Sequence, residues 1–142
     1  MRFLRLAVVC CLISMFAYFP SEIKGFPGAG RCAIAKLKTE RANSKAIFVG
    51  KVLSVASDGD IKTFTFEVEK RWKGAASKKI KVNVQETTRY QAWFEVGKKY
   101  LVFARGDETG KLWEQRCSRT KPLADASEDV SELKKLRKPI KK

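Results

Sequence analysis

Apolar and polar residues alternate along much of the chain between residues 46 and 117, as expected for β-strands with one buried face. In the clearest stretch, KTFTFEVEKRWKG, Phe64, Phe66 and Val68 share one face, while threonine and charged side chains occupy the other. The stretch KKYLVFA is apolar on both faces, which predicts a central strand. The pattern predicts five strands, at residues 46–55, 62–73, 78–86, 98–104 and 111–117.

Helical spacing replaces this alternation before the first predicted strand. Residues 33–44, AIAKLKTERANS, are compatible with a helix. Such a helix would place Ile34, Leu37 and Arg41 on one side. We therefore expect a helix to precede the strands.

A second helix is predicted after the last strand, over residues 125–137. Asp125 and Glu128 stand where an N-cap residue and its return partner are expected, and Pro139 would stop the helix. Its apolar side is formed by Leu123, Ala126, Val130 and Leu133. The strands are thus flanked by helices at both ends.

Short turns connect the predicted strands. Asp58-Gly59 favours a tight hairpin, and Gly50 in the middle of the first strand favours a bulge or a sharp coil. Five coiled strands joined in this way predict a mainly β fold: a five-stranded closed barrel of the oligonucleotide/oligosaccharide-binding (OB) type with N- and C-terminal helices. Nucleic-acid OB domains usually place a helix between strands three and four, where this chain has an aromatic loop.

The first 30 residues have the features of a secretory signal peptide. Two arginines precede a 14-residue apolar run, Leu6 to Phe19, which is short for a transmembrane span. An uncleaved membrane anchor is the alternative interpretation. Cleavage after Gly30 would leave Arg31 first, and cleavage after Gly25 fits the small-residue rule as well. We expect export, to the extracellular space or, in a bacterium, to the periplasm.

Removing this leader would leave one domain, at 31–137, and a short basic tail, at 138–142. The leader carries two of the four cysteines, so Cys32 and Cys117 remain. An even pair in an exported protein is most simply a disulfide, with two independent buried thiols as the alternative.

The chemistry of the chain argues against an enzyme. It contains no histidine, which excludes Ser-His-Asp and Cys-His catalysis and removes the commonest zinc ligand. Ser118 and Thr120 could pass for nucleophiles, but we expect their hydroxyl groups to bond the backbone at the exit from the last strand. No catalytic residue, intrinsic metal site or cofactor is expected.

Four segments resemble a known family in order and spacing. They are AIFVGKVLSV, FTFEVEKRWKG, FEVGKKYLVFA and CSRTKPLADASEDVSEL. Together they resemble the OB-fold domain of the tissue inhibitors of metalloproteinases and the wider netrin-like family, most closely its minimal secreted forms. The resemblance covers about residues 32–133 and implies the same barrel, a secreted location and binding of another protein.

The chain departs from the family pattern at two cysteines. The family begins with Cys-X-Cys and has a further cysteine before the F-x-V-G segment, whereas this chain has Gly30-Arg31-Cys32 and TTRYQAWFEVG. In the family the two missing cysteines pair with each other, which leaves Cys32 to pair with Cys117.

The resemblance implies that the family's inhibitory mechanism, if present, would use Cys32 and Ala33. In the inhibitors, the free α-amine and the carbonyl of the first cysteine chelate the zinc of the protease, and the next residue fills its specificity pocket. In this chain that mechanism requires cleavage after Arg31. Any residue ahead of Cys32 removes the chelating amine.

The candidate partners follow from the surface. Tyr90, Trp93 and Phe94 cluster in the loop before the fourth strand, and either fold over the barrel mouth or project as a binding patch. We expect a protein partner, with a secreted metalloproteinase as the narrower form. The formal net charge of +15 supports an alternative, binding of a polyanionic glycan or an anionic lipid surface. Nucleic acid ranks lower, because an exported protein rarely meets it.

Overall fold

The structure is a computed structural model that describes residues 32–74, 76–88 and 90–136. The expected leader and the basic tail lie outside these residues. None of the helices in the described ranges is both long and apolar enough to cross a membrane.

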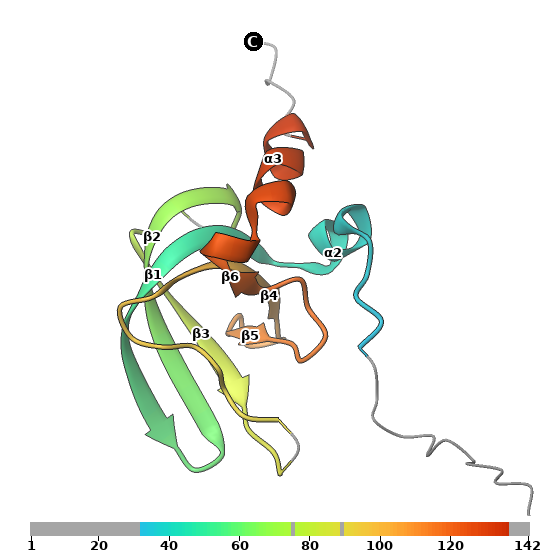
Figure 1. Cartoon of the computed structure of the whole chain (residues 1–142). Coiled ribbons are helices and arrows are strands. Elements are labelled where there is room, and N and C mark those ends of the chain that lie inside the picture. Colours follow the sequence, from blue (N-terminus) through green and yellow to red (C-terminus); the bar gives the residue numbers. More distant parts are fainter. Residues whose placement is uncertain (1–31, 75, 89, 137–142) are drawn as a thin grey trace, which may run out of the picture. The chain divides into compact units, whose positions relative to one another are not determined.

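The strands form a closed barrel with the connectivity of an OB fold (Figure 1). They are β1 (Ala46–Asp58), β2 (Ile61–Lys73), β3 (Lys79–Gln85), β4 (Lys99–Gly106), β5 (Leu112–Glu114) and β6 (Lys121–Pro122). The sheet order is β1-β2-β3-β5-β4-β6, and pairing of β1 with β4 closes the barrel. β3 and β5 pair in parallel, and all other pairs are antiparallel. The predicted five-stranded barrel is confirmed, and β6 only extends the sheet beside β4.

The long β1–β2 ribbon supplies the coiling that closure requires. Its register shifts at three places, one of them between Val49 and Gly50, where the sequence predicted a bulge. A Cβ atom on Gly50 would lie 2.9 Å from the carbonyl oxygen of Glu67, so only glycine allows the two strands to approach this closely. At the hairpin turn Gly59 adopts a φ of 55°, as the Asp-Gly pair predicted.

The closed sheet has an apolar cluster on each of its two faces. The barrel interior contains Ala46, Phe48, Val52, Phe64, Phe66, Ile80, Val82, Val84, Phe94, Tyr100, Val102 and Ala104. The outer cluster contains Leu37, Ile47, Val49, Leu101, Phe103, Ala126 and Leu133. β4 contributes alternate residues to both clusters, which confirms that it is a central strand.

The two helices cover the outer face of β1 and β4. The first helix, α2 (Leu37–Asn43), is shorter than predicted, because residues 32–36 have no regular secondary structure. Its buried residues are Leu37 and Glu40, whereas Ile34 is 60% exposed. Ile34 precedes the helix, so the prediction that it shares one helical side with Leu37 and Arg41 is wrong.

The second helix, α3, spans Ser127–Leu136 and follows a 3₁₀ turn, η2 (Leu123–Asp125). The backbone N–H of Val130 donates to the carbonyl of Ala126, so Ala126 occupies the N-cap position predicted for Asp125. Asp125 lies in the 3₁₀ turn instead. The apolar stripe was predicted correctly: Ala126 and Leu133 are buried in the outer cluster, with Leu123 and Val130 packed against it.

Candidate protein-binding surface

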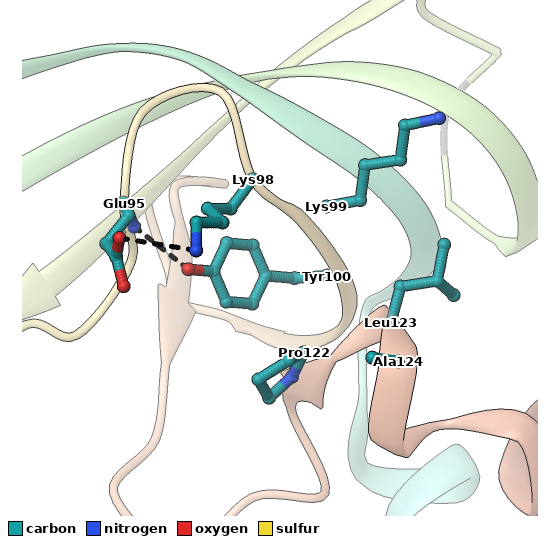
Figure 2. Close-up of a pocket in the computed structure, with 7 residues that line it drawn as sticks. All are labelled: Glu95, Lys98, Lys99, Tyr100, Pro122, Leu123 and Ala124. Carbon is teal, nitrogen blue, oxygen red and sulfur yellow. Dashed lines mark hydrogen bonds and ion pairs between the residues drawn. The ribbon is translucent and has the colours of Figure 1, made fainter.

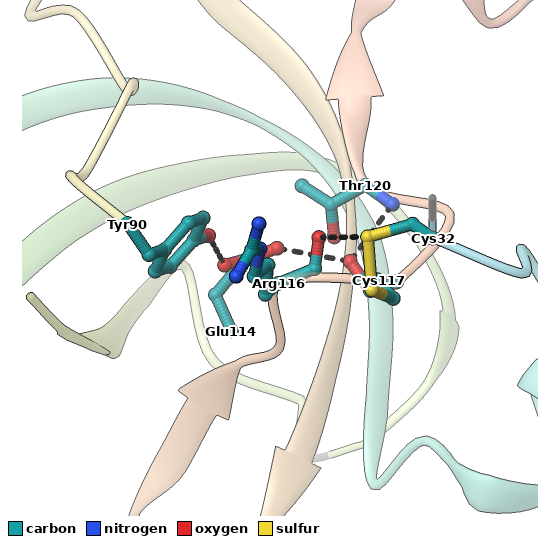
Figure 3. Close-up of a disulfide and its surroundings, with 7 residues drawn as sticks. Cys32, Tyr90, Glu114, Arg116, Cys117 and Thr120 are labelled. Atoms are coloured by element: carbon teal, nitrogen blue, oxygen red, sulfur yellow. Dashed lines mark hydrogen bonds between the residues drawn. A yellow bond between two sulfur atoms is a disulfide. The ribbon is translucent and has the colours of Figure 1, made fainter. Parts of the chain in front are cut away.

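A disulfide links Cys32 to Cys117, with an S–S distance of 2.11 Å and a sequence separation of 85. The predicted pairing is confirmed, and both cysteines lie at the surface. The predicted fifth strand ends early at Glu114, because a turn closed by Ser118 N–H to Gln115 O carries Cys117 to its partner. In Figure 3 the disulfide lies beside Arg116, whose carbonyl oxygen is 3.7 Å from the Cys32 sulfur.

The segment after the disulfide uses its hydroxyl groups to hold the barrel closed. Ser118 Oγ donates to Glu114 Oε1 (3.0 Å) and accepts from the backbone N–H of Thr120 (3.1 Å). Thr120 Oγ1 accepts from the backbone N–H of Phe103 (2.9 Å). Both side chains are buried. The predicted backbone-bonding role is confirmed, and neither hydroxyl is placed to act as a nucleophile.

Arg119 joins three parts of the chain. Its guanidinium donates twice to Asp129 of α3 and once, at 3.0 Å, to the carbonyl of Ala35. Lys121 Nζ lies 2.9 Å from the same carboxylate. Burial raises the pKa of Asp129, but the hydrogen bonds from Arg119 and Lys121 outweigh it and hold the pKa below its usual range. The segment 32–35 is therefore held at Cys32 by the disulfide and at Ala35 by the hydrogen bond from Arg119.

A hydrogen-bonded pair, the half-buried Tyr90 and the buried Glu114, lies between the disulfide and the β3–β4 loop (Figure 3). The hydroxyl of Tyr90 donates to Glu114 Oε2, so Glu114 receives hydrogen bonds at both oxygens. Burial raises the pKa of Glu114, and the charge of Glu40 adds to this effect. Burial and the neighbouring Glu114 also raise the pKa of Tyr90. Glu114 is only 6% exposed, and its hydrogen bond with Tyr90 fastens the loop to the barrel.

The three aromatic residues of the β3–β4 loop are placed differently. Phe94 is buried in the barrel interior, with edge-on contacts to Phe64, Phe66 and Tyr100. Tyr90 is half-buried, and Trp93 packs on Phe94 and Tyr100 while remaining 36% exposed. The loop thus folds over the barrel mouth, and of the three residues Trp93 has the most exposed ring.

An apolar groove of about 520 Å³ lies beside this loop (Figure 2). Its lining combines the apolar side chains of Tyr100, Pro122, Leu123 and Ala124 with the charged residues Glu95, Lys98 and Lys99. The hydroxyl of Tyr100 accepts a hydrogen bond from the backbone N–H of Glu95 (3.0 Å), which holds the loop against the groove.

Two of the exposed large apolar side chains belong to the loop beside this groove. Among the described residues, the exposed side chains of this kind are Ile34, Val55, Trp93 and Val96. Trp93 and Val96 belong to the loop that borders the groove, and Val96 is 56% exposed. We call Trp93, Val96 and the groove the loop surface.

The other predicted site lies in the segment that starts at Cys32. Ala33 is exposed, as required of a residue that enters a partner's pocket, and Ile34 beside it is exposed as well. The sequence did not point to the groove, because Tyr100 comes from β4 and Pro122 from β6, and only the tertiary fold brings these strands together. It also did not point to the ion pair between Arg119 and Asp129, although the basic residue after Cys117 and the acid in the predicted helix were visible signals.

A scan against protein-family models and a search of curated proteins give no match to the chain. In the described ranges, no group of three or more acidic, cysteine or histidine side chains is arranged to hold a metal ion.

Proposed function

We propose that the protein is an exported, non-enzymatic OB-fold module, similar to the tissue inhibitors of metalloproteinases, that binds another protein through the loop surface. The observation that carries this proposal is the pairing of an apolar groove with two exposed apolar side chains, Trp93 and Val96, on a fastened loop. A central apolar anchor with a charged rim is the usual arrangement of a protein-binding hot spot.

The rigidity of the loop supports the same proposal. Tyr90 binds Glu114, Phe94 fills the barrel, and the backbone of Glu95 binds Tyr100. The backbone N–H of Ala92 also donates to Glu86 Oε1 (2.8 Å). Because folding already holds this loop in place, binding a partner would cost little further conformational entropy, which favours affinity.

Inhibition of a secreted zinc metalloproteinase is the narrower form of this proposal. It would use Cys32 and Ala33, whose segment is held by the disulfide and by the hydrogen bond from Arg119 to Ala35. The mechanism depends on a free α-amine at Cys32. A protein that begins at Arg31 would keep the loop surface but lose the zinc-chelating group.

Binding to a panel of purified extracellular zinc metalloproteinases tests both forms of the proposal. Val96→Asp should weaken binding at least about tenfold, because it places a charge in the apolar contact. Val55→Asp makes the same change on the β1–β2 hairpin and should alter affinity less than about twofold. Equal effects of the two variants would refute the loop surface as the contact. No binding to any enzyme of the panel would refute the narrower form of the proposal.

Two forms of the protein separate the inhibitory mechanism from simple binding. The form that begins at Cys32 should inhibit peptide cleavage, and the form that begins at Arg31 should bind without chelating zinc. Equal inhibition by both forms would exclude the chelation mechanism.

A second candidate function is the binding of surface polyanions. The observation that favours it is the formal net charge of +15 on the chain of 142 residues, which has 30 basic residues against 15 acidic ones. Such a charge attracts anionic glycans or lipid surfaces, and the attraction weakens with added salt.

A further inference from the structure

A groove of about 390 Å³ lies between α2 and the end of β2. We call it the helix groove. It shares no lining residue with the groove of Figure 2, and no described residue of β3, β4 or β5 lines it. Cationic side chains dominate its lining, which consists of Lys38, Arg41, Ala42, Trp72 and Lys73.

No acid among the described residues forms an ion pair with these cations. This holds for Lys38 and Arg41 on α2 and for Lys73 on β2. The single acid of α2, Glu40, is buried, and its carboxylate lies 3.7 Å from Arg105. The helix groove therefore keeps positive charge that is available to an anion.

Folding fixes the position of one of the cations. Lys73 Nζ donates to the carbonyl oxygens of Arg41 (2.9 Å) and Ala42 (3.2 Å) in the last turn of α2. Carbonyls at this end of a helix carry partial negative charge and stabilise a cation. An ammonium group has three N–H donors, so one remains for a ligand. These bonds join the two sides of the groove before any ligand binds.

Trp72 gives the groove an aromatic wall. Lys70 Nζ lies 5.2 Å from the centroid of its ring, a cation–π contact that places a further cation beside the groove. The indole N–H of Trp72 is buried and has no acceptor among the described residues. A buried donor without an acceptor is unfavourable, and a phosphate oxygen that reached it from the groove would supply the acceptor.

We propose that the helix groove binds the phosphate headgroup of an anionic phospholipid at a membrane surface. This inference rests on the second candidate function and assigns a site and a ligand class to it. Tryptophan beside lysine and arginine suits the membrane–water interface, because the ring is amphipathic and the cations attract anionic headgroups.

The form of the groove favours one headgroup over a polymer. Its cations come from two elements and converge on one cavity, whereas a linear polyanion contacts cations that are spread along a track. A single-stranded nucleic acid fits less well for a second reason, since non-specific sites for single strands stack successive bases on several aromatic rings. Trp72 is the one aromatic side chain among the described lining residues.

Co-sedimentation with vesicles of phosphatidylglycerol and phosphatidylcholine tests the site. Lys38→Gln with Arg41→Gln should weaken binding about thirtyfold, because two cations that contact anionic headgroups are lost. The matched control is Lys79→Gln with Lys81→Gln, which removes the same charge from exposed positions on β3 and should weaken binding less than about threefold. Vesicles of phosphatidylcholine alone should not bind measurably.

Trp72 provides a second readout that does not depend on the charge changes. Its fluorescence, isolated by Trp93→Phe and Trp113→Phe, should change on addition of the phosphatidylglycerol vesicles. Equal weakening by the two pairs of substitutions, or an unchanged Trp72 signal, would show attraction without this groove and would overturn the inference alone.

Two further probes separate a lipid from other anions. Glycerol 3-phosphate should bind far more weakly than the vesicles, and equal affinity per phosphate would assign the groove to soluble phosphate esters and overturn the choice of a lipid. Binding of a heparin hexasaccharide without binding of the vesicles would overturn the inference and leave the second candidate function standing. Binding of neither would overturn both.

Discussion

Replacement of Arg119 by methionine tests how α3 and the segment around Ala35 are held. The change keeps most of the aliphatic stem and removes three hydrogen bonds, two to Asp129 and one to Ala35 O. Asp129 is 2% exposed and would keep only Lys121 as a partner. Loss of one partner of a buried ion pair costs about 3 to 5 kcal/mol, and the remaining Lys121 offsets part of this. We expect the free energy of unfolding to fall by about 2 to 4 kcal/mol.

Equilibrium unfolding in urea, with the disulfide intact, measures this loss. Arg71→Met on β2 is the control, because Arg71 forms no ion pair with a described residue; it should cost less than about 0.5 kcal/mol. The double variant Arg119→Met with Asp129→Leu removes both charges and should be more stable than the sum of the single effects predicts, by about 1 to 3 kcal/mol. Additive single effects would refute the ion pair as the link.

The same variant has a defined pH dependence. An acid whose pKa is lowered in the folded state contributes stability above its ordinary value, 3.8 for aspartate, and loses that contribution as the pH falls through the folded pKa. The stability difference between the wild type and Arg119→Met should therefore narrow in strong acid. A difference that stays constant down to the acid limit would contradict the assignment of the cost to the Asp129 carboxylate.

The remaining predictions concern the disulfide, two buried acids and one close-packed glycine. Replacement of Cys32 and Cys117 by serine should lower the free energy of unfolding by about 4 to 5 kcal/mol, because the unfolded chain gains entropy when a loop of 85 residues is no longer closed. Urea unfolding of the reduced wild type should show the same loss. The fully buried carboxylate of Glu40 accepts no hydrogen bond from a described residue and lies 3.7 Å from its ion-pair partner, so Glu40→Met should stabilise the fold by about 1 to 3 kcal/mol in thermal unfolding. Gly50→Ala should destabilise it by about 1 to 3 kcal/mol, because the added Cβ would lie 2.9 Å from a backbone oxygen of β2. Because burial raises the pKa of Glu114, the folded state binds this proton more tightly than the unfolded state, and stability should fall as the pH rises from 4.5 through the folded pKa; Glu114→Gln should flatten this part of the profile.

The barrel could be predicted because its strands obey a simple alternation. Phe64 and Phe66 on β2, like Val82 and Val84 on β3, occupy the buried faces that the pattern indicates. The Asp58-Gly59 pair correctly predicted the position of the hairpin turn. These features depend on neighbouring residues in the chain, so they can be recognised in a single sequence.

The ends of the domain were harder to predict because long-range links override local preference. Residues 33–36 have helix-compatible side chains, but the disulfide at Cys32 and the hydrogen bond at Ala35 keep them out of the helix. The predicted fifth strand was too long for the same reason, since Cys117 must leave the sheet to reach its partner. Trp113, in this shortened strand, is half-buried and donates its indole N–H to Asp107.

The candidate sites, too, were only partly predictable from the sequence. The aromatic loop was visible in the sequence, but its splitting into a buried Phe94 and an exposed Trp93 depends on where the barrel mouth lies. The groove beside this loop could not be predicted, because the pairing of Tyr100 with Pro122 joins strands that are separated by β5 in the chain.

The position of the cross-link has a consequence for biogenesis. At a synthesis rate of about 5 to 20 residues per second, Cys117 would follow Cys32 by roughly 4 to 17 s, given their separation of 85 residues. During that interval the β1–β2–β3 meander can form, but the parallel strand that seals it has not yet been made. Until Cys117 has been synthesised, the nascent chain would expose an unpaired sheet edge and the free thiol of Cys32. An unpaired edge invites pairing with other chains, which a chaperone would prevent, and a free thiol requires an oxidase.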